Sequence, residues 1–240
     1  MKKELIVITG ASSGIGEAVA KSFAALGHPL LLVARRIERL LELNHPNTLC
    51  KKVDITDRNS FKDAIDEAEQ QFGPVSCLIN NAGVMLLGLM HEQNPDEWQK
   101  MLDVNIMGVM NGIYAVLPKM MLRKSGTIIN ISSIAGRKTF PNHAAYCGTK
   151  FAVHAITENI REEVASHNIR LITVAPGAVE TELLGHTTSD AIKSGYNEWK
   201  KQMGKILSPE DVANAILFAF QQPQSVCVRE IVLAATKQEP

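Results

Sequence analysis

Tyr146 and Lys150 form the side-chain pair in this sequence that is best suited to proton chemistry. They are four residues apart, so on a helix they share one face. A free phenol has a pKa of about 10, too high for a good base at neutral pH, and a nearby ammonium favours the phenolate. Because such pairs are also common on solvated helix surfaces, the spacing alone does not establish a site.

Two serines at the end of the apolar run GTIINIS (126–132) add to this pattern. A reaction at a carbonyl or alcohol group needs a proton donor or acceptor at the substrate oxygen, and a hydrogen bond that polarises this oxygen also helps. Tyr146 fits the first role. The hydroxyl of Ser133, or of its competitor Ser132, fits the second.

A glycine-rich turn, TGASSGIG (9–16), follows the first apolar run and precedes a helical pattern. Glycines at 10, 14 and 16 permit a tight turn, a close approach of backbone and close packing of helix on strand, and the N–H groups at the helix start suit a pyrophosphate. The spacing G-x-x-x-G-x-G differs from the common G-x-G-x-x-G pattern. The position between strand and helix favours a dinucleotide site.

These residues must be positioned by short strands that alternate with helices. The Val-, Ile- and Leu-rich runs mostly lack polar alternation, as expected for strands covered on both faces. Predicted strands are 4–9, 29–34, 48–54, 75–80, 126–132, 169–175 and 227–234, and predicted helices are 15–27, 58–72, 96–123, 143–167 and 209–221, the last capped by Ser208 with Pro209 at its first position.

This alternation predicts one doubly wound α/β domain over residues 1–240, with ligands beyond the carboxyl ends of the strands. Lysine plus arginine and aspartate plus glutamate both number 25, so the charge balance does not favour a nucleic-acid or membrane partner. Four scattered cysteines show no metal spacing, and the apolar N-terminal run, which reaches only Ile8, is shorter than expected for a signal peptide or a membrane span. We expect a cytoplasmic protein without a bound metal.

The motifs TGASSGIG, NNAG (80–83) and YCGTK (146–150) occur in an order and spacing that resemble the short-chain dehydrogenase/reductase family. The resemblance covers essentially the whole chain. It implies a seven-stranded Rossmann sheet, a nicotinamide cofactor and a homotetramer.

The resemblance also assigns roles to individual residues. It implies that Ser133 holds the substrate oxygen, that Tyr146 is the acid/base, that Lys150 lowers the tyrosine pKa and binds the ribose, and that Asn105 supports a proton relay from the lysine through water. The family spacing to the tyrosine favours Ser133 over Ser132. The cofactor residues expected from motif and resemblance together are Gly10, Ser12, Ser13, Gly14, Ile15, Gly16, Arg35, Arg36, Asp54, Ile55, Asn81, Ala82, Gly83, Tyr146, Lys150, Pro176, Gly177, Val179 and Thr181.

Arg35 and Arg36 stand where an NAD-binding fold has an acidic residue for the ribose 2′-hydroxyl, about 20 positions after the last glycine. A guanidinium can fork onto a 2′-phosphate, so we predict NADP(H) over NAD(H), with Arg35 the favoured ligand. Arg36 would help, or face solvent, or lie on the adenine. The glycine turn carries Ser12 and Ser13 and no basic residue, so the preference need not be absolute.

The substrate is less well defined by the sequence. NNAGVMLLG, SSIAGRK and TELLGH resemble the branch that holds clavaldehyde and sulfoacetaldehyde reductases and 3-hydroxy-acid dehydrogenases of the serine type, which implies a small polar carbonyl or alcohol. The alternatives are a steroid or acyl-chain ketoreductase and, in another class, a non-catalytic NADP-binding regulator. Residues at about 183–205 have a helical pattern and are expected to form a lid over the substrate.

Overall fold

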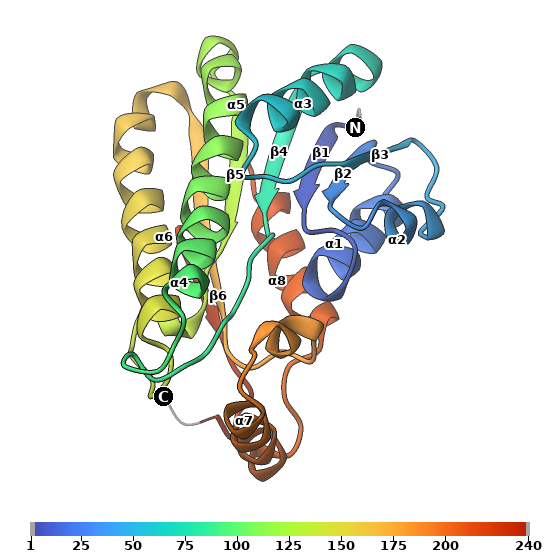
Figure 1. Cartoon of the computed structure of the whole chain (residues 1–240). Helices are drawn as coiled ribbons and strands as arrows, with labels where there is room; N and C mark the ends of the chain where they lie inside the picture. The colour runs from blue at the N-terminus through green and yellow to red at the C-terminus, as the bar shows by residue number, and fades with distance from the viewer. Residues whose placement is uncertain (1–2, 239–240) are drawn as a thin grey trace.

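A parallel sheet of seven strands forms the centre of the computed structural model, which describes residues 3–238 (Figure 1). The strands are β1 (Leu5–Thr9), β2 (Leu30–Ala34), β3 (Thr48–Lys52), β4 (Val75–Asn80), β5 (Gly126–Ile131), β6 (Ile169–Pro176) and β7 (Glu230–Leu233), in the order β3-β2-β1-β4-β5-β6-β7. All seven predicted strands are present and every pair is parallel. The predicted α/β fold is therefore confirmed, and β7 is shorter than expected because only residues 230–233 pair with β6.

Helices follow most strands and cover both faces of the sheet. They are α1 (Gly14–Ala25), α2 (Ile37–Glu42), α3 (Arg58–Phe72), α4 (Pro95–Leu102), α5 (Gly108–Arg123), α6 (Ala144–Glu163), α7 (Asp190–Met203) and α8 (Pro209–Gln221). The short α2 was not among the predicted helices. Residues 1, 2, 239 and 240 of the predicted domain lie outside the described residues.

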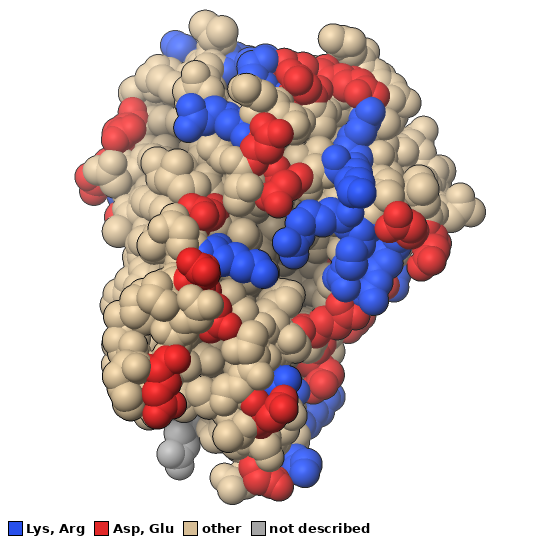
Figure 2. All heavy atoms as spheres, viewed as in Figure 1, with Lys and Arg blue, Asp and Glu red and all other residues tan. Residues whose placement is uncertain are grey.

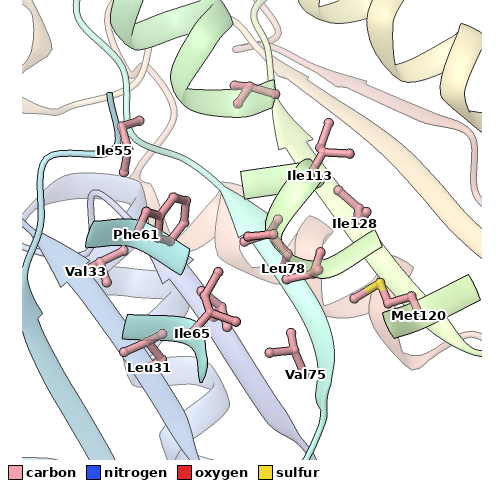
Figure 3. Close-up of a cluster of buried hydrophobic side chains, with 14 of the residues drawn as sticks. Leu31, Val33, Ile55, Phe61, Ile65, Val75, Leu78, Ile113, Met120 and Ile128 are labelled. Atoms are coloured by element: carbon pink, nitrogen blue, oxygen red, sulfur yellow. The ribbon is translucent and has the colours of Figure 1, made fainter. Parts of the chain in front are cut away.

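The sheet separates two hydrophobic cores because successive side chains of a strand point to opposite faces. In β1, Leu5 and Val7 pack toward α3, α5 and α6, whereas Ile6 and Ile8 pack toward α1 and α8. Figure 3 shows the first core, where Phe61 of α3 lies near side chains of the strands. In the five central strands, burial on both faces explains the continuous apolar runs, whereas the edge strands β3 and β7 are only partly buried.

The predicted helix over 96–123 is present as one helical stretch, Pro95–Arg123, but it is not α-helical throughout. A single π-helical turn, η1 (Asp103–Met107), separates α4 from α5, and such turns are frequent at functional sites. The whole stretch Pro95–Arg123 is long and apolar enough to cross a membrane, but half of its apolar window is buried inside the protein, as in a core helix.

The caps of α3 and α8 show how local sequence sets helix starts. The Ser208 hydroxyl accepts a hydrogen bond from the Asp211 N–H, and the Asp211 carboxylate accepts one from the Ser208 N–H, so the predicted cap is confirmed as a capping box. The Asp57 carboxylate accepts hydrogen bonds from the N–H groups of Asn59 and Ser60 at the start of α3.

The sheet order reverses direction between β1 and β4, and in doubly wound sheets ligands bind at such a switch point beyond the carboxyl ends of the strands. In Figure 1, α7 lies beyond those ends, apart from the main body. Figure 2 shows basic side chains gathered on the side of the molecule where β3 and α2 lie. The functional site is therefore expected at the carboxyl ends of β2, β1, β4 and β5.

Candidate active site

A cavity of about 900 Å³ lies at the carboxyl edge of the sheet, within the size range of small-molecule sites. All but two of the candidate residues expected from the sequence line it. They are Gly10, Ser12, Ser13, Gly14, Ile15, Arg35, Arg36, Asp54, Ile55, Asn81, Ala82, Gly83, Ser133, Tyr146, Lys150, Pro176, Gly177, Val179 and Thr181. Gly16 and Asn105 lie behind this surface, where they support it.

The glycine turn after β1 has a backbone shape that other residues would strain. Gly10 has a φ of +66°, in the left-handed region that favours glycine. A Cβ on Gly16 would collide with the carbonyl oxygen of Gly10, so α1 can pack this closely only because Gly16 lacks a side chain. The turn leaves the N-terminus of α1 facing the cavity, which is the geometry that binds anionic phosphates.

The NNAG segment after β4 holds this turn in place. The Asn81 side-chain amide donates hydrogen bonds to the carbonyl oxygens of Thr9 (2.9 Å) and Gly10 (3.2 Å). In return, the Thr9 hydroxyl accepts from the N–H groups of Asn81 (2.9 Å) and Ala82 (3.0 Å). These reciprocal bonds join the ends of β1 and β4 and fix the floor of the cavity.

Tyr146 and Lys150 lie on one face of α6, and both side chains are almost completely buried. The Lys150 ammonium donates to the Ile131 carbonyl oxygen at 2.9 Å and lies 5.7 Å from the centre of the Tyr146 ring. Burial lowers the pKa of Lys150 to about 8, because the charged form loses its hydration.

Burial also raises the pKa of Tyr146 above that of a free phenol, and this effect outweighs the hydrogen bond with Ser133, which acts in the opposite direction. The Tyr146–Lys150 spacing indicates only the ammonium, which favours the phenolate. Desolvation was missed because no spacing pattern reports how deeply a side chain is buried.

The two competing serines both line the cavity, but their hydroxyls have different partners. The Ser132 hydroxyl is buried and donates to the Lys150 carbonyl oxygen at 3.1 Å, so it anchors α6 to β5. The Ser133 hydroxyl lines the cavity, accepts a hydrogen bond from the Ala135 N–H at 3.1 Å and contacts Tyr146. This geometry favours Ser133 as the hydroxyl that meets a substrate.

Asn105 lies in the π-turn η1 and is buried. Its side chain accepts a hydrogen bond from the Val84 N–H (2.8 Å) and donates to the Val84 carbonyl oxygen (2.9 Å) and to the Thr149 hydroxyl (3.1 Å). Asn105 therefore connects the segment after NNAG to α6, where its partner Thr149 directly precedes Lys150.

The arginines after β2 lie in contrasting environments. Arg36 donates to the hydroxyls of Ser13 (2.8 Å) and Ser12 (3.3 Å) and forms a 2.8 Å ion pair with Glu182. Arg35 also lines the cavity, and within residues 3–238 no hydrogen bond or ion pair holds it. Two guanidinium groups thus stand at the end of the cavity formed by β2 and the glycine turn.

The two aspartates after β3 have separate surroundings. The Asp54 carboxylate accepts hydrogen bonds from the N–H (3.0 Å) and hydroxyl (2.8 Å) of Thr56 and lines the cavity, and Asp57 caps α3. The cap of α3 is therefore Asp57 and not Asp54.

Several cavity residues were not among the candidates from sequence. The Gln238 side-chain oxygen accepts from the Ala178 N–H at 2.9 Å, and its amide nitrogen is buried with no partner among the described residues. His143 Nδ1 donates to the Pro141 carbonyl oxygen (2.6 Å), which leaves Nε2 as an acceptor. Glu182 also lines the cavity, and no sequence motif indicates an ion pair for it. Of these three residues, only His143 could have been suspected from the sequence, because it lies three residues before Tyr146.

The part of the cavity near Tyr146 is lined mainly by apolar and aromatic side chains. Met85 and Leu183 contribute to it, and Tyr196 and Trp199 of α7 pack edge to face with ring centres 5.1 Å apart. Tyr196 also lies 6.3 Å from the His143 ring. In the described part of the chain, no group of three His, Cys, Asp or Glu side chains is arranged to hold a metal ion.

Comparison with known proteins gives a consistent result. Residues 4–192 match the family model described as short chain dehydrogenase. An uncharacterized oxidoreductase of Staphylococcus saprophyticus is 41% identical over 244 residues, which cover 99% of this chain and 98% of that protein.

Solved structures with the same fold include two NADP complexes. The closed form of serine dehydrogenase complexed with NADP+ has a TM-score of 0.92 and 29% identity, covering 98% of this chain and 96% of that one. ElxO with NADP bound has a TM-score of 0.82 and 30% identity, covering 97% of each chain.

Proposed function

The chain belongs to the short-chain dehydrogenase family of oxidoreductases, and we propose that it interconverts a small carbonyl compound and its alcohol with NADP(H). One observation carries this proposal. A single cavity holds the hydroxyls of Tyr146 and Ser133 near β5 and the guanidinium groups of Arg35 and Arg36 after β2. The strands β1 and β4 separate these two ends, so an extended dinucleotide can span them.

The residues of the cavity fit such a cofactor. The left-handed Gly10 and the close contact at Gly16 form a cradle for a pyrophosphate, and Asp54 and Ile55 border the adenosine side. In this proposal Lys150 binds the ribose, and Val179 and Thr181 bind the carboxamide; all three residues line the cavity. When bound, the nicotinamide supplies or accepts the hydride.

Tyr146 moves the proton in this proposal. In the reductive direction its hydroxyl gives a proton to the substrate oxygen while Ser133 donates a hydrogen bond to the same atom. Because burial keeps Tyr146 protonated at neutral pH, the site suits reduction there. Lys150 is placed to return the proton, and Asn105 keeps α6 and the NNAG segment in register.

A comparison of NADPH with NADH tests the choice of cofactor. We expect the wild-type protein to have a higher kcat/KM with NADPH, because guanidinium groups bind a dianionic 2′-phosphate. Arg35→Asp should reverse the order of the two cofactors by repelling the phosphate. A wild-type preference for NADH would refute the assignment of these arginines.

The substrate has two candidates, each supported by an observation. A small polar carbonyl is supported by the NADP-complexed serine dehydrogenase among the structural neighbours and by the acceptor nitrogen of His143. A carbonyl with an apolar or aromatic substituent is supported by Met85, Tyr196 and Trp199 in the cavity. Initial rates on a panel of short hydroxylated, aromatic and long-chain aldehydes and ketones, followed by NADPH absorbance, distinguish them.

We also propose that residues 183–205, which include α7, close over the substrate.

We further propose that the chain forms a homotetramer. Exposed apolar side chains on the outer faces of α5 and α6, Met110, Tyr114 and Phe151, support association through these helices. Light scattering coupled to size-exclusion chromatography tests this, and a monomer at micromolar concentration would contradict it. A cytoplasmic location stays a prediction.

A further inference from the structure

The Glu182 carboxylate lies between two arginines at the end of the cavity assigned to the 2′-phosphate. One oxygen lies 2.8 Å from Nη1 of Arg36 and the other 2.7 Å from Nη1 of Arg39. The three residues come from two distant parts of the chain, since Arg36 is the N-cap of α2, Arg39 lies within α2, and Glu182 begins the 3-10 turn η4 (Glu182–His186). Nothing in the proposed function uses this contact.

The hydrogen bonds of Arg36 show which partner a phosphate has to replace. Its Nη2 donates to the hydroxyls of Ser12 and Ser13, and each hydroxyl can still donate its own hydrogen to a phosphate oxygen. A carboxylate only accepts hydrogen bonds and repels an anion. The serines can therefore remain when a phosphate arrives, whereas Glu182 and the phosphate oppose each other at the same guanidinium.

Arg39 makes this exchange easier. It holds the second carboxylate oxygen of Glu182 independently of Arg36, so Glu182 keeps an ion pair when Arg36 turns to another anion. The three side chains are about half exposed, where a single ion pair has a modest free energy and an exchange of partners is readily reversible.

We propose that Glu182 is an internal competitor of the cofactor 2′-phosphate for Arg36, and so a specificity-determining residue that weakens the preference for NADP(H) over NAD(H). The proposal rests on the proposed function, because it takes the phosphate of NADP(H) to lie at Arg35 and Arg36.

Glu182→Gln tests the proposal, because it keeps the size of the side chain and removes its charge. Isothermal titration with adenosine 2′,5′-bisphosphate, 5′-AMP, NADPH and NADH measures the effect directly. At low ionic strength we expect the two 2′-phosphorylated ligands to bind to Glu182→Gln about two- to fivefold more tightly than to wild type. This is the range expected for an exposed ion pair. The affinities for 5′-AMP and NADH should not change.

Glu180→Gln is the matched control. Glu180 is two residues earlier on the same segment, and its partner is Lys200 at 3.5 Å, not an arginine of α2. The Glu180→Gln variant removes the same charge and is expected to leave the affinities for all four ligands unchanged. A similar gain in Glu180→Gln would mean that only net charge matters, and it would overturn the proposal.

Arg36→Ala provides the second arm. If Glu182 acts through Arg36, the gain from Glu182→Gln should disappear in the Arg36→Ala background. Unchanged or weaker binding of NADPH by Glu182→Gln would overturn the competitor role. Failure of the proposed function has a different signature, since wild type would then bind adenosine 2′,5′-bisphosphate no better than 5′-AMP.

Discussion

The two ends of the cavity control charge in opposite ways. At the catalytic end, Tyr146 and Lys150 are about 95% buried, and removal from water dominates their chemistry. At the adenosine end, Arg36 and Glu182 are about half exposed, and direct ion pairs dominate. Burial lowers the pKa of Lys150 to about 8, whereas Arg39 and Arg36 lower the pKa of Glu182 to about 2.

This difference indicates what each end can tolerate. A buried titratable group has few alternative partners, so changing it alters the reaction itself. An exposed ion pair can exchange partners with little loss, so changing it adjusts the choice of ligand. The catalytic end should therefore respond strongly to single substitutions, and the adenosine end in graded steps.

The largest expected effect is the loss of turnover in Tyr146→Phe. Removing the hydroxyl removes the proton donor, so kcat should fall about 10²- to 10⁴-fold, the usual contribution of general acid catalysis. The Kd for NADPH, measured by fluorescence titration, should stay within about twofold of wild type. A variant that keeps its activity would refute the role of Tyr146, and a wild type without turnover on any carbonyl would favour a non-catalytic regulator.

The next largest expected effect is a difference in pH dependence between alcohol oxidation and carbonyl reduction. Alcohol oxidation needs the Tyr146 phenolate, and burial raises the pKa of that phenol. Oxidation should therefore accelerate by up to about tenfold per pH unit above neutral, while reduction stays flat between pH 6 and pH 8. Initial rates over this range in buffers of constant ionic strength measure both. An oxidation rate that is already flat at pH 7 would show that bound ligands reverse the effect of burial.

Lys150→Met should raise stability while it abolishes function. Below about pH 8 the folded protein holds a buried ammonium, and a methionine of similar length avoids the loss of its hydration. We expect the free energy of unfolding at pH 7 to increase by about 1–3 kcal/mol in urea titrations. Between pH 8 and pH 10.5 only the unfolded state keeps the proton, so wild-type stability rises with pH and the advantage of the variant shrinks.

The smallest expected effects separate Asp54 from Asp57 at the exposed end. Asp57→Ala removes the cap of α3 and should lower Tm without changing the KM for NADPH. Asp54→Ala should instead raise the KM for NADPH, because Asp54 lines the cavity. Thermal melts and steady-state kinetics on both variants decide this, and equal losses of Tm would remove the distinction.

The same division explains how much could be predicted from the sequence. Strand positions were predictable because burial on both faces imposes continuous apolar runs. The glycine turn was predictable because the backbone geometry at Gly10 and Gly16 favours glycine. Local rules also located the Ser208 cap. These features depend on residues that are close together in the sequence.

Features that depend on distant contacts were not predictable. The Glu182 bridge joins residues about 145 positions apart, and Gln238 reaches Ala178 from the end of the described chain. The raised pKa of Tyr146 depends on how many side chains exclude water from it. Asn105 was expected from family resemblance, but its bonds to Val84 were visible only once the strands were assembled.

The π-turn at Asp103–Met107 makes the site sensitive to the number of residues in this segment. It contains one residue more than an ordinary helical turn, while buried Val109 and Ile113 fix the helix that follows. Deleting one codon within 103–107 would let α4 and α5 merge into a regular helix and turn Asn105 away from Val84. We expect such a deletion to keep the fold and disrupt the site, so the length of this turn matters as well as its residue types.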